Sequence, residues 1–257
     1  MKIKFIILGC GSSLGVPRAD GNWGKCDPKE KKNYRTRCSA LIKSKVKNIL
    51  IDTSPDLRHQ LIKNNITNID LVIYSHKHGD QVHGINDLRI FSLKNSKKIP
   101  IFADYETKKY LYNNFNYCFN DTPSYKAILK LNLLKKNFKF SSKKNTISIK
   151  SVAVQHGKIK SQSFIINKSC AYINDANKIY KKDMKYFKNL NYFVIDCLRH
   201  DKHPSHFNLT EVIELTKILK PKKTILTNLH SDLDYNDLIN ILPKNIVPAY
   251  DGMSFYI

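Results

Sequence analysis

The stretch "YSHKHGDQVHG", residues 74–84, contains three histidines and an aspartate. Its first residues complete the apolar run "LVIYS", which predicts a buried strand that ends at His76. Imidazole and carboxylate groups this close together are typical of a metal site, because both are ligands of zinc-like ions. The sequence therefore predicts that His76, His78 and Asp80 hold a metal ion.

Four further strand-like runs also end at a residue of a metal-binding type. Strand ends in α/β proteins present side chains to a common crevice, so groups far apart in the sequence can converge. A carboxylate can bridge two ions, and two ions that share a hydroxide would make a nucleophile and clamp the oxygens of a phosphoryl centre. Asp175 is the candidate bridge. The four residues are His156 after "SVAVQ", Asp175 after "AYIN", Asp196 after "YFVI" and His230 after "TILTNL".

The charge of the chain favours an anionic substrate without identifying a nucleic-acid surface. The formal net charge is +23, but only six of the 44 basic residues are arginine, and the lysines are scattered. This pattern indicates a solvated, lysine-rich surface more than a nucleic-acid footprint. The charge would still attract a small anionic molecule.

The cysteines and the N-terminus favour a cytoplasmic protein. No two of the six cysteines form a C-x-x-C pair, which indicates reduced, buried thiols. The N-terminal apolar run is about five residues, shorter than a secretory signal requires, and we expect residues 3–8 to form the first strand. No stretch has the apolar length of a membrane span.

Short β-rich runs alternate with helical ones, which predicts an α/β fold with a single domain over residues 1–257. The early "GCGSSLG" does not open a dinucleotide-binding helix, because prolines and glycines follow it. Helices are expected over residues 55–64, 86–94, 105–118, 178–189 and 209–219, the last with Asn208 and Glu211 in a capping box. The expected strands are "KIKFIIL", "CSALI", "NILID", "LVIYS", "IPIFA", "SIKSVAVQ", "SFIIN", "CAYIND", "YFVIDC" and "KTILTNL".

The motif "HKHGD" and the strand-end residues downstream resemble the metallo-β-lactamase-fold hydrolases, in their characteristic order and across essentially the whole chain. The motifs "ILGCGSSLGVP", "ILIDTSPDLR", "HGINDLR" and "HPSHFNL" are similar to the branch that includes phosphoribosyl cyclic phosphate phosphodiesterases. The resemblance implies an αββα sandwich with two divalent metal ions, zinc or manganese. It implies that one ion is held by His76, His78 and His156, the other by Asp80 and His230, with Asp175 bridging.

Two features depart from the pattern of these relatives. Position 81, a histidine in the H-x-H-x-D-H pattern of the superfamily, is glutamine here, and its amide oxygen is a weaker ligand for a zinc-like ion. His83 could compensate, but positions 81 and 83 face apart on a helix, so a hydrogen-bonding role is favoured for it. Cys26 stands alone where the phosphonate-pathway enzyme has closely spaced cysteines, so no structural zinc is expected.

The leaving group of a phosphodiester needs a proton, and His206 is the candidate donor, with Asp80 as a second catalytic residue. His206 precedes a predicted helix start, where backbone N–H groups favour a phosphate, and by resemblance it matches the general acid of the cyclic phosphodiesterase branch. His203 is the alternative donor or substrate contact. Arg37 could bind a phosphate through paired donors or form a surface salt bridge, whereas Asp52 and Asp56 are expected to organise loops.

The sequence therefore predicts a cytoplasmic metallo-phosphodiesterase acting on a small anionic phosphodiester, with cyclic phosphates and nucleotides as candidate substrates. A tRNA 3′-processing-type endoribonuclease of the same fold is an alternative, although no glycine-rich basic arm is visible. A non-catalytic nucleic-acid-binding relative is the other alternative, and the retention of all six expected ligands argues against it. A homodimer is compatible with the sequence.

Overall fold

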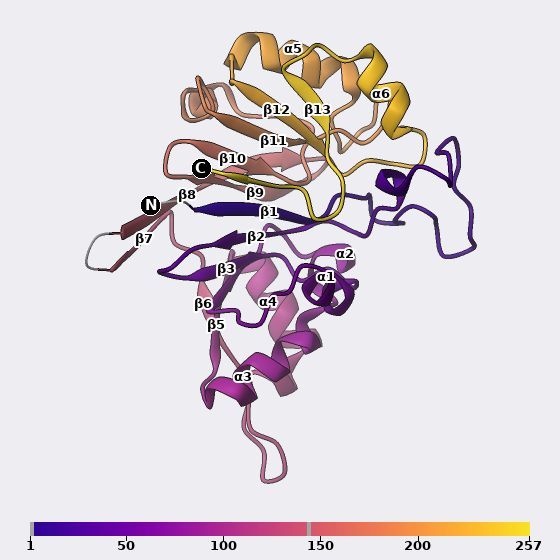
Figure 1. Cartoon of the computed structure of the whole chain (residues 1–257). Coiled ribbons are helices and arrows are strands. Elements are labelled where there is room, and N and C mark those ends of the chain that lie inside the picture. The colour runs from indigo at the N-terminus through magenta and orange to yellow at the C-terminus, as the bar shows by residue number, and fades with distance from the viewer. Residues whose placement is uncertain (1–2, 143–144) are drawn as a thin grey trace.

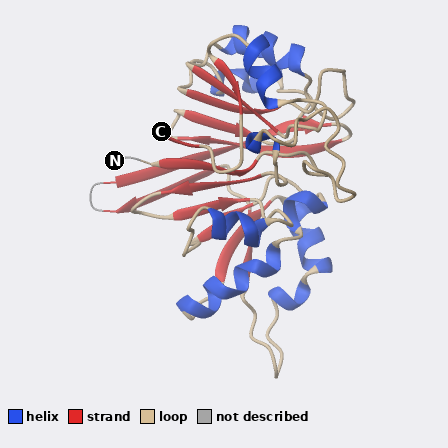
Figure 2. Ribbon diagram, turned by 45° about the vertical axis from the view of Figure 1, so that its right-hand side comes forward, coloured by secondary structure: helices blue, strands red, loops and turns tan. Residues whose placement is uncertain are grey.

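A computed structural model describes residues 3–142 and 145–257, which form two seven-stranded sheets packed face to face and flanked by helices (Figures 1 and 2). The predicted αββα sandwich is therefore confirmed. The first sheet has the order β14 (Ser254–Tyr256), β1 (Lys4–Gly9), β2 (Ser39–Lys43), β3 (Asn48–Ile51), β4 (Leu71–Ile73), β5 (Ile99–Ala103) and β6 (Leu129–Leu133). The second has the order β13 (Ile246–Pro248), β12 (Lys223–Thr227), β11 (Tyr192–Asp196), β10 (Cys170–Ile173), β9 (Ile159–Ile166), β8 (Asn145–His156) and β7 (Asn137–Ser142).

Helices cover the outer face of each sheet (Figure 1). The chain also contains short 3₁₀ turns. A helix was expected over residues 178–189, but only the 3₁₀ turn η4 (Lys181–Tyr186) forms there. That prediction was wrong: none of residues 181–186 is fully buried, and Met184 and Tyr186 pack only partly against the core from this short turn. The first sheet is covered by α1 (Leu57–Lys63), α2 (Gly79–Val82), α3 (Arg89–Asn95) and α4 (Tyr105–Asn114), and the second by α5 (Leu209–Leu219) and α6 (Tyr235–Ile241). The remaining turns are η1 (Lys31–Asn33), η2 (Ile85–Leu88) and η3 (Asn116–Cys118).

The period-two pattern of the strands explains the layers. In β1, Phe5 and Ile7 face the core between the two sheets, whereas Ile6 and Leu8 face the core under the helices of the first sheet. A strand that is buried on both faces reads as a continuous apolar run. Among the described residues, no helix is both long and apolar enough to cross a bilayer.

The parallel strands place the candidate ligands at one edge of the sandwich. Strands β3 to β6 are parallel in the first sheet, and β10 to β13 are parallel in the second. Their carboxyl ends therefore release loops toward the same region. Helix α5 begins there too, with the predicted capping box formed: Glu211 N donates to Asn208 Oδ1 at 2.9 Å, and Asn208 N donates to Glu211 Oε2 at 3.0 Å.

Candidate metal centre

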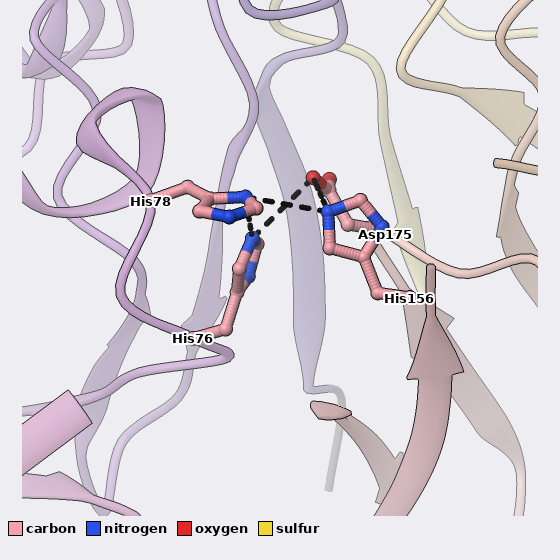
Figure 3. Close-up of side chains that lie close together, drawn as sticks. All are labelled: His76, His78, His156 and Asp175. Atoms are coloured by element: carbon pink, nitrogen blue, oxygen red, sulfur yellow. Dashed lines mark hydrogen bonds and ion pairs between the residues drawn. The ribbon is translucent and has the colours of Figure 1, made fainter. Parts of the chain in front are cut away.

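Three histidines and one aspartate meet at the edge of the sandwich (Figure 3). One potential ligand atom from each of His76, His78, His156 and Asp175 lies within 4.8 Å of the others. Nδ1 of His78 is 2.9 Å from Nε2 of His76 and 3.3 Å from Nε2 of His156. Oδ2 of Asp175 is 3.5 Å from Nε2 of His76 and 3.6 Å from Nε2 of His156.

Both sheets contribute to this cluster. His76 and His78 lie on the loop that follows β4 of the first sheet. His156 ends β8, and Asp175 follows β10, and both of these strands belong to the second sheet. His76, His156 and Asp175 are buried, and His78 is exposed, so the cluster opens to solvent on the side of His78.

The surroundings of the histidines prepare them for a cation. Nδ1 of His156 donates to the carbonyl oxygen of Ser205 at 2.7 Å, and Nδ1 of His76 is 3.0 Å from Oγ of Ser75, which leaves each Nε2 directed into the cluster. Burial lowers the pKa of His78, lowers that of His76 well below its usual value and lowers that of His156 to about 4. Neutral imidazoles beside a carboxylate fit a zinc-like divalent ion.

Asp80 and Gln81 lie next to this cluster and form a pair with each other. Gln81 is fully buried, and its Nε2 donates to Oδ2 of Asp80 at 2.9 Å. Its Oε1 accepts from Nδ2 of Asn174 at 2.7 Å. The amide oxygen of Gln81 is therefore occupied by Asn174 in this arrangement, and its N–H group faces Asp80.

His230 lies on the same cavity but outside the group of four. Its Nε2 is 3.3 Å from Nη2 of Arg18, and its Nδ1 is 3.0 Å from Oδ2 of Asp232. Arg18 also donates to Oγ of Ser231 at 3.2 Å. A guanidinium group thus lies where a cation on Nε2 of His230 would be.

A histidine–carboxylate pair forms another wall of the cavity. Nδ1 of His206 is 2.7 Å from Oδ2 of Asp196, which is fully buried, and the ring of His206 lies 4.7 Å from that of His156 between centroids. Burial lowers the pKa of His206, but the charge of Asp196 outweighs this and raises it to about 9. Asn228 Nδ2 donates to Oδ1 of Asp196 at 3.0 Å and helps to hold the pair. Asp196 therefore orients His206 and lies outside the group of four.

The cavity that these groups enclose has a volume of about 310 Å³. His203 lines it, with Nδ1 3.2 Å from Oγ of Ser205, and its ring lies 5.1 Å from that of His206. The polar residues of the wall are Ser12, Ser13, His78, Asp80, His156, Asp175, Arg199, His203, Ser205, His206, Asn228 and His230.

Two candidates lie elsewhere. His83 is exposed, with Nε2 3.2 Å from the hydroxyl of Tyr110, and its ring packs against Phe115. Arg37 forms a two-pronged ion pair with Asp56, with N–O distances of 2.8 and 2.6 Å, and the residues that line the cavity do not include it.

Sequence reasoning missed the residues that hold the ligands in place. Asn174 and Asn228 carry no motif, although they stand beside a predicted ligand or at a strand end, where a polar residue could have been noticed. Ser205 lies in the motif "HPSHFNL" but was given no role. Arg18 lies in a loop after β1, 212 positions from His230, and no local signal joins them.

The family follows from a comparison with known proteins. A model of the beta-lactamase superfamily domain matches residues 47–228. The chain belongs to this superfamily. The chain is similar to the crystal structure of "a New Diphosphatase from the PhnP Family", with 27% sequence identity and a TM-score of 0.88. The match covers 100% of this chain and 98% of the diphosphatase chain. The predicted metallo-β-lactamase fold is thus confirmed.

Two other relatives are named for different activities. Human tRNase Z, short form, has 15% identity and a TM-score of 0.70 over 98% of both chains, which shows a shared fold alone. An octanoyltransferase of Porphyromonas gingivalis is 28% identical over 255 residues, 98% of this chain and 51% of that protein. The chain spans about half the length of that curated relative.

Proposed function

We propose that this hydrolase is a metal-dependent phosphodiesterase that acts on a small, anionic phosphodiester in the cytoplasm. The observation that carries the proposal is the His206–Asp196 pair, which lies beside the three-histidine cluster on the wall of one cavity. A cluster suited to a divalent cation and a proton donor are the two parts that cleavage of a phosphodiester with a poor leaving group requires.

The residues present fit two cations of unequal affinity. We assign the tighter one to His76, His78, His156 and Asp175, whose donor atoms already converge. The weaker one would be held by Asp80, Asp175 and His230, with Gln81 beside them. Zinc or manganese suits these donors, and the cations when bound supply Lewis acidity and an activated water.

His206 would deliver the proton to the leaving oxygen. Its Nδ1 is held by Asp196, so Nε2 is the nitrogen free to donate. The same ion pair keeps the imidazole protonated at neutral pH, because it raises the pKa to about 9. Asn228 and Asp196 fix the direction of the ring, so the proton is presented at one place in the cavity.

The cavity and the relatives support a small substrate. A volume of about 310 Å³ suits a nucleotide-sized or smaller molecule. The PhnP-family structure is named a diphosphatase, which supports cleavage of a phosphorus–oxygen bond. Octanoyl transfer through a thiol finds no support among the six cysteines, because all are buried and burial raises the pKa of each.

The test is a panel of substrates offered to zinc- or manganese-loaded protein. The panel contains cyclic nucleotide phosphates, linear alkyl and diphosphate diesters, a precursor tRNA and an octanoyl thioester. We expect turnover of a small phosphodiester, lost in Asp175→Ala and retained in the exposed control Asp201→Ala. Turnover of the precursor tRNA or the thioester alone would overturn the proposal.

A further inference from the structure

A chain of buried polar side chains leads away from the metal centre, from Asp80 through Gln81 and Asn174 toward Asp52. Gln81 Nε2 donates to Asp80 at 2.9 Å, and Asn174 Nδ2 donates to Gln81 Oε1 at 2.7 Å. Burial raises the pKa of the Asp52 carboxyl, and the side chain of Asn174 partly offsets this effect. Gln81, Asn174 and Asp52 are each at most 1% exposed.

Two oxygens in this chain lack a hydrogen-bond partner. They are Oδ1 of Asn174 and Oδ2 of Asp52, both buried. An unsatisfied buried oxygen costs about 1–3 kcal/mol, so such atoms are rare and call for an explanation. Both belong to the two residues at the Asp52 end of the chain.

The backbone around these groups is fixed, which leaves the amide groups as the parts that can turn. Thr53 N donates to the carbonyl oxygen of Gln81 at 2.8 Å, and Ser75 N donates to Oδ1 of Asp52 at 2.7 Å. Asp52 itself has a φ of 61°, a left-handed conformation that aspartate tolerates and that is held here by its neighbours.

We propose that Asp52, Asn174 and Gln81 form a switch that opens the weaker cation site by rotating two amide groups. An amide carries a donor and an acceptor of nearly equal size, so a half-turn exchanges them without changing the packing. After both amides turn, Oε1 of Gln81 faces Asp80, Nε2 of Gln81 donates to Oδ1 of Asn174, and Nδ2 of Asn174 donates to Oδ2 of Asp52. Both unpartnered oxygens gain a donor.

The rotation changes which atom of Gln81 faces a second cation. In the present arrangement an N–H group of Gln81 faces Asp80, and this donor satisfies one carboxylate oxygen without a cation. In the rotated arrangement an amide oxygen faces Asp80 instead, and oxygen donors suit Mn²⁺ better than they suit Zn²⁺. Asp52 therefore acts as a positioning residue, because its carboxylate is the acceptor that stabilises the cation-binding arrangement.

Substitution of Asp52 tests the switch directly. In Asp52→Asn, the new amide can still accept from Ser75 N, but its Nδ2 donates to Oδ1 of Asn174 and locks the present arrangement. We expect the affinity for the second Mn²⁺ to fall about 10- to 100-fold, with the first unchanged. Isothermal titration calorimetry of the chelated protein measures both, and electron paramagnetic resonance counts the bound ions. Asp70→Asn, remote from the site, is the matched control.

A charge-swapped variant separates the switch from general damage to the site. In Asp52→Asn/Asn174→Asp, the carboxylate at position 174 can only accept, so Gln81 must turn its oxygen toward Asp80. We expect the second affinity to recover to within a few-fold of the wild type. If Asp52→Asn does not fold, Asn174→Ala cuts the same chain and should weaken only the second cation.

Two results would overturn the proposal. One is a wild-type protein that binds a single Mn²⁺, and the other is a second affinity that Asp52→Asn and Asn174→Ala leave unchanged. The switch rests on the two-cation site of the proposed function, but because no substrate enters these measurements, their failure is distinguishable from failure of the phosphodiesterase activity.

Discussion

Nη2 of Arg18 donates to Nε2 of His230 at 3.3 Å, so the guanidinium occupies the position of a cation that this histidine would bind. Two positive charges at one nitrogen repel each other, and Arg18 must move before a cation can bind there. Arg18 would therefore compete with the proposed second cation.

The first prediction is that Arg18→Met tightens the weaker cation site. Removal of the competing charge should raise the affinity for the second Mn²⁺ about tenfold and leave the first unchanged, as measured by calorimetric titration. Arg58→Met, which removes an exposed arginine remote from the cavity, is the control. An unchanged or weaker second affinity would show that Arg18 does not compete at this site.

The second prediction concerns Asp175 as the bridge. Its carboxyl lies 3.5 and 3.6 Å from the Nε2 atoms of His76 and His156. Asp175→Ala removes a ligand and a negative charge from between two cations, so the occupancy of both sites should fall together. Metal content after dialysis, measured by mass spectrometry, checks this. A variant that loses one cation and keeps the other at full occupancy would exclude a bridging role.

The third prediction separates proton donation by His206 from a role in positioning the phosphate. An alkoxide leaves slowly without a proton, whereas a nitrophenolate leaves readily, and general acid catalysis contributes about 10²- to 10⁴-fold. In His206→Ala, kcat for an alkyl or ribosyl phosphodiester should fall by about this factor, while bis(p-nitrophenyl) phosphate is largely spared and the metal content stays unchanged. Equal losses on both substrates would identify His206 as a positioning residue, and His203→Ala is then tested on the same pair.

The fourth prediction is a pH dependence of stability that Asp52 imposes on the metal-free protein. Burial raises the pKa of its carboxyl to about 7, above the value of about 3.9 in an unfolded chain. The folded state therefore binds more protons between these values, and the free energy of unfolding falls as the pH rises from about 4 to about 7. In Asp52→Asn, this fall in the free energy of unfolding should disappear, because an amide does not titrate in this range.

Urea unfolding at pH 5 and pH 8 checks the fourth prediction. Relative to the wild type, Asp52→Asn should be more stable at pH 8 than at pH 5, by about 3 kcal/mol at most. Asp70→Asn should show no such difference. The same relative stability at both pH values would mean that Asp52 does not titrate in this range.

The sequence predicts the parts of the fold that depend on local pattern. Continuous apolar runs marked the central strands, and the metal-type residues at their ends were expected to converge, as His76, His156 and Asp175 do. Strands β13 and β14 were not predicted, because each has only three residues at the edge of a sheet, which is too few for a periodic signal.

The finer structure of the site depends on contacts that no local pattern encodes. Gln81 is held by Asn174, 93 positions away, and this partner decides which atom of the amide faces Asp80. The resemblance marked position 81 as unusual, but the direction of that amide depends on a hydrogen-bond partner far along the chain.

The cluster draws its ligands from both halves of the sandwich, and His78 and His156 are 78 positions apart. A cation bound to both is a cross-link between two separately built sheets, which closes a long loop that the unfolded chain leaves open. Folding must bring the sheets together before the cation gains its full set of ligands, and the bound cation then holds them together by mass action. If the proposed cation is bound, chelators should therefore loosen the contact between the sheets first, and the supply of metal would affect the lifetime of the protein as well as its proposed activity.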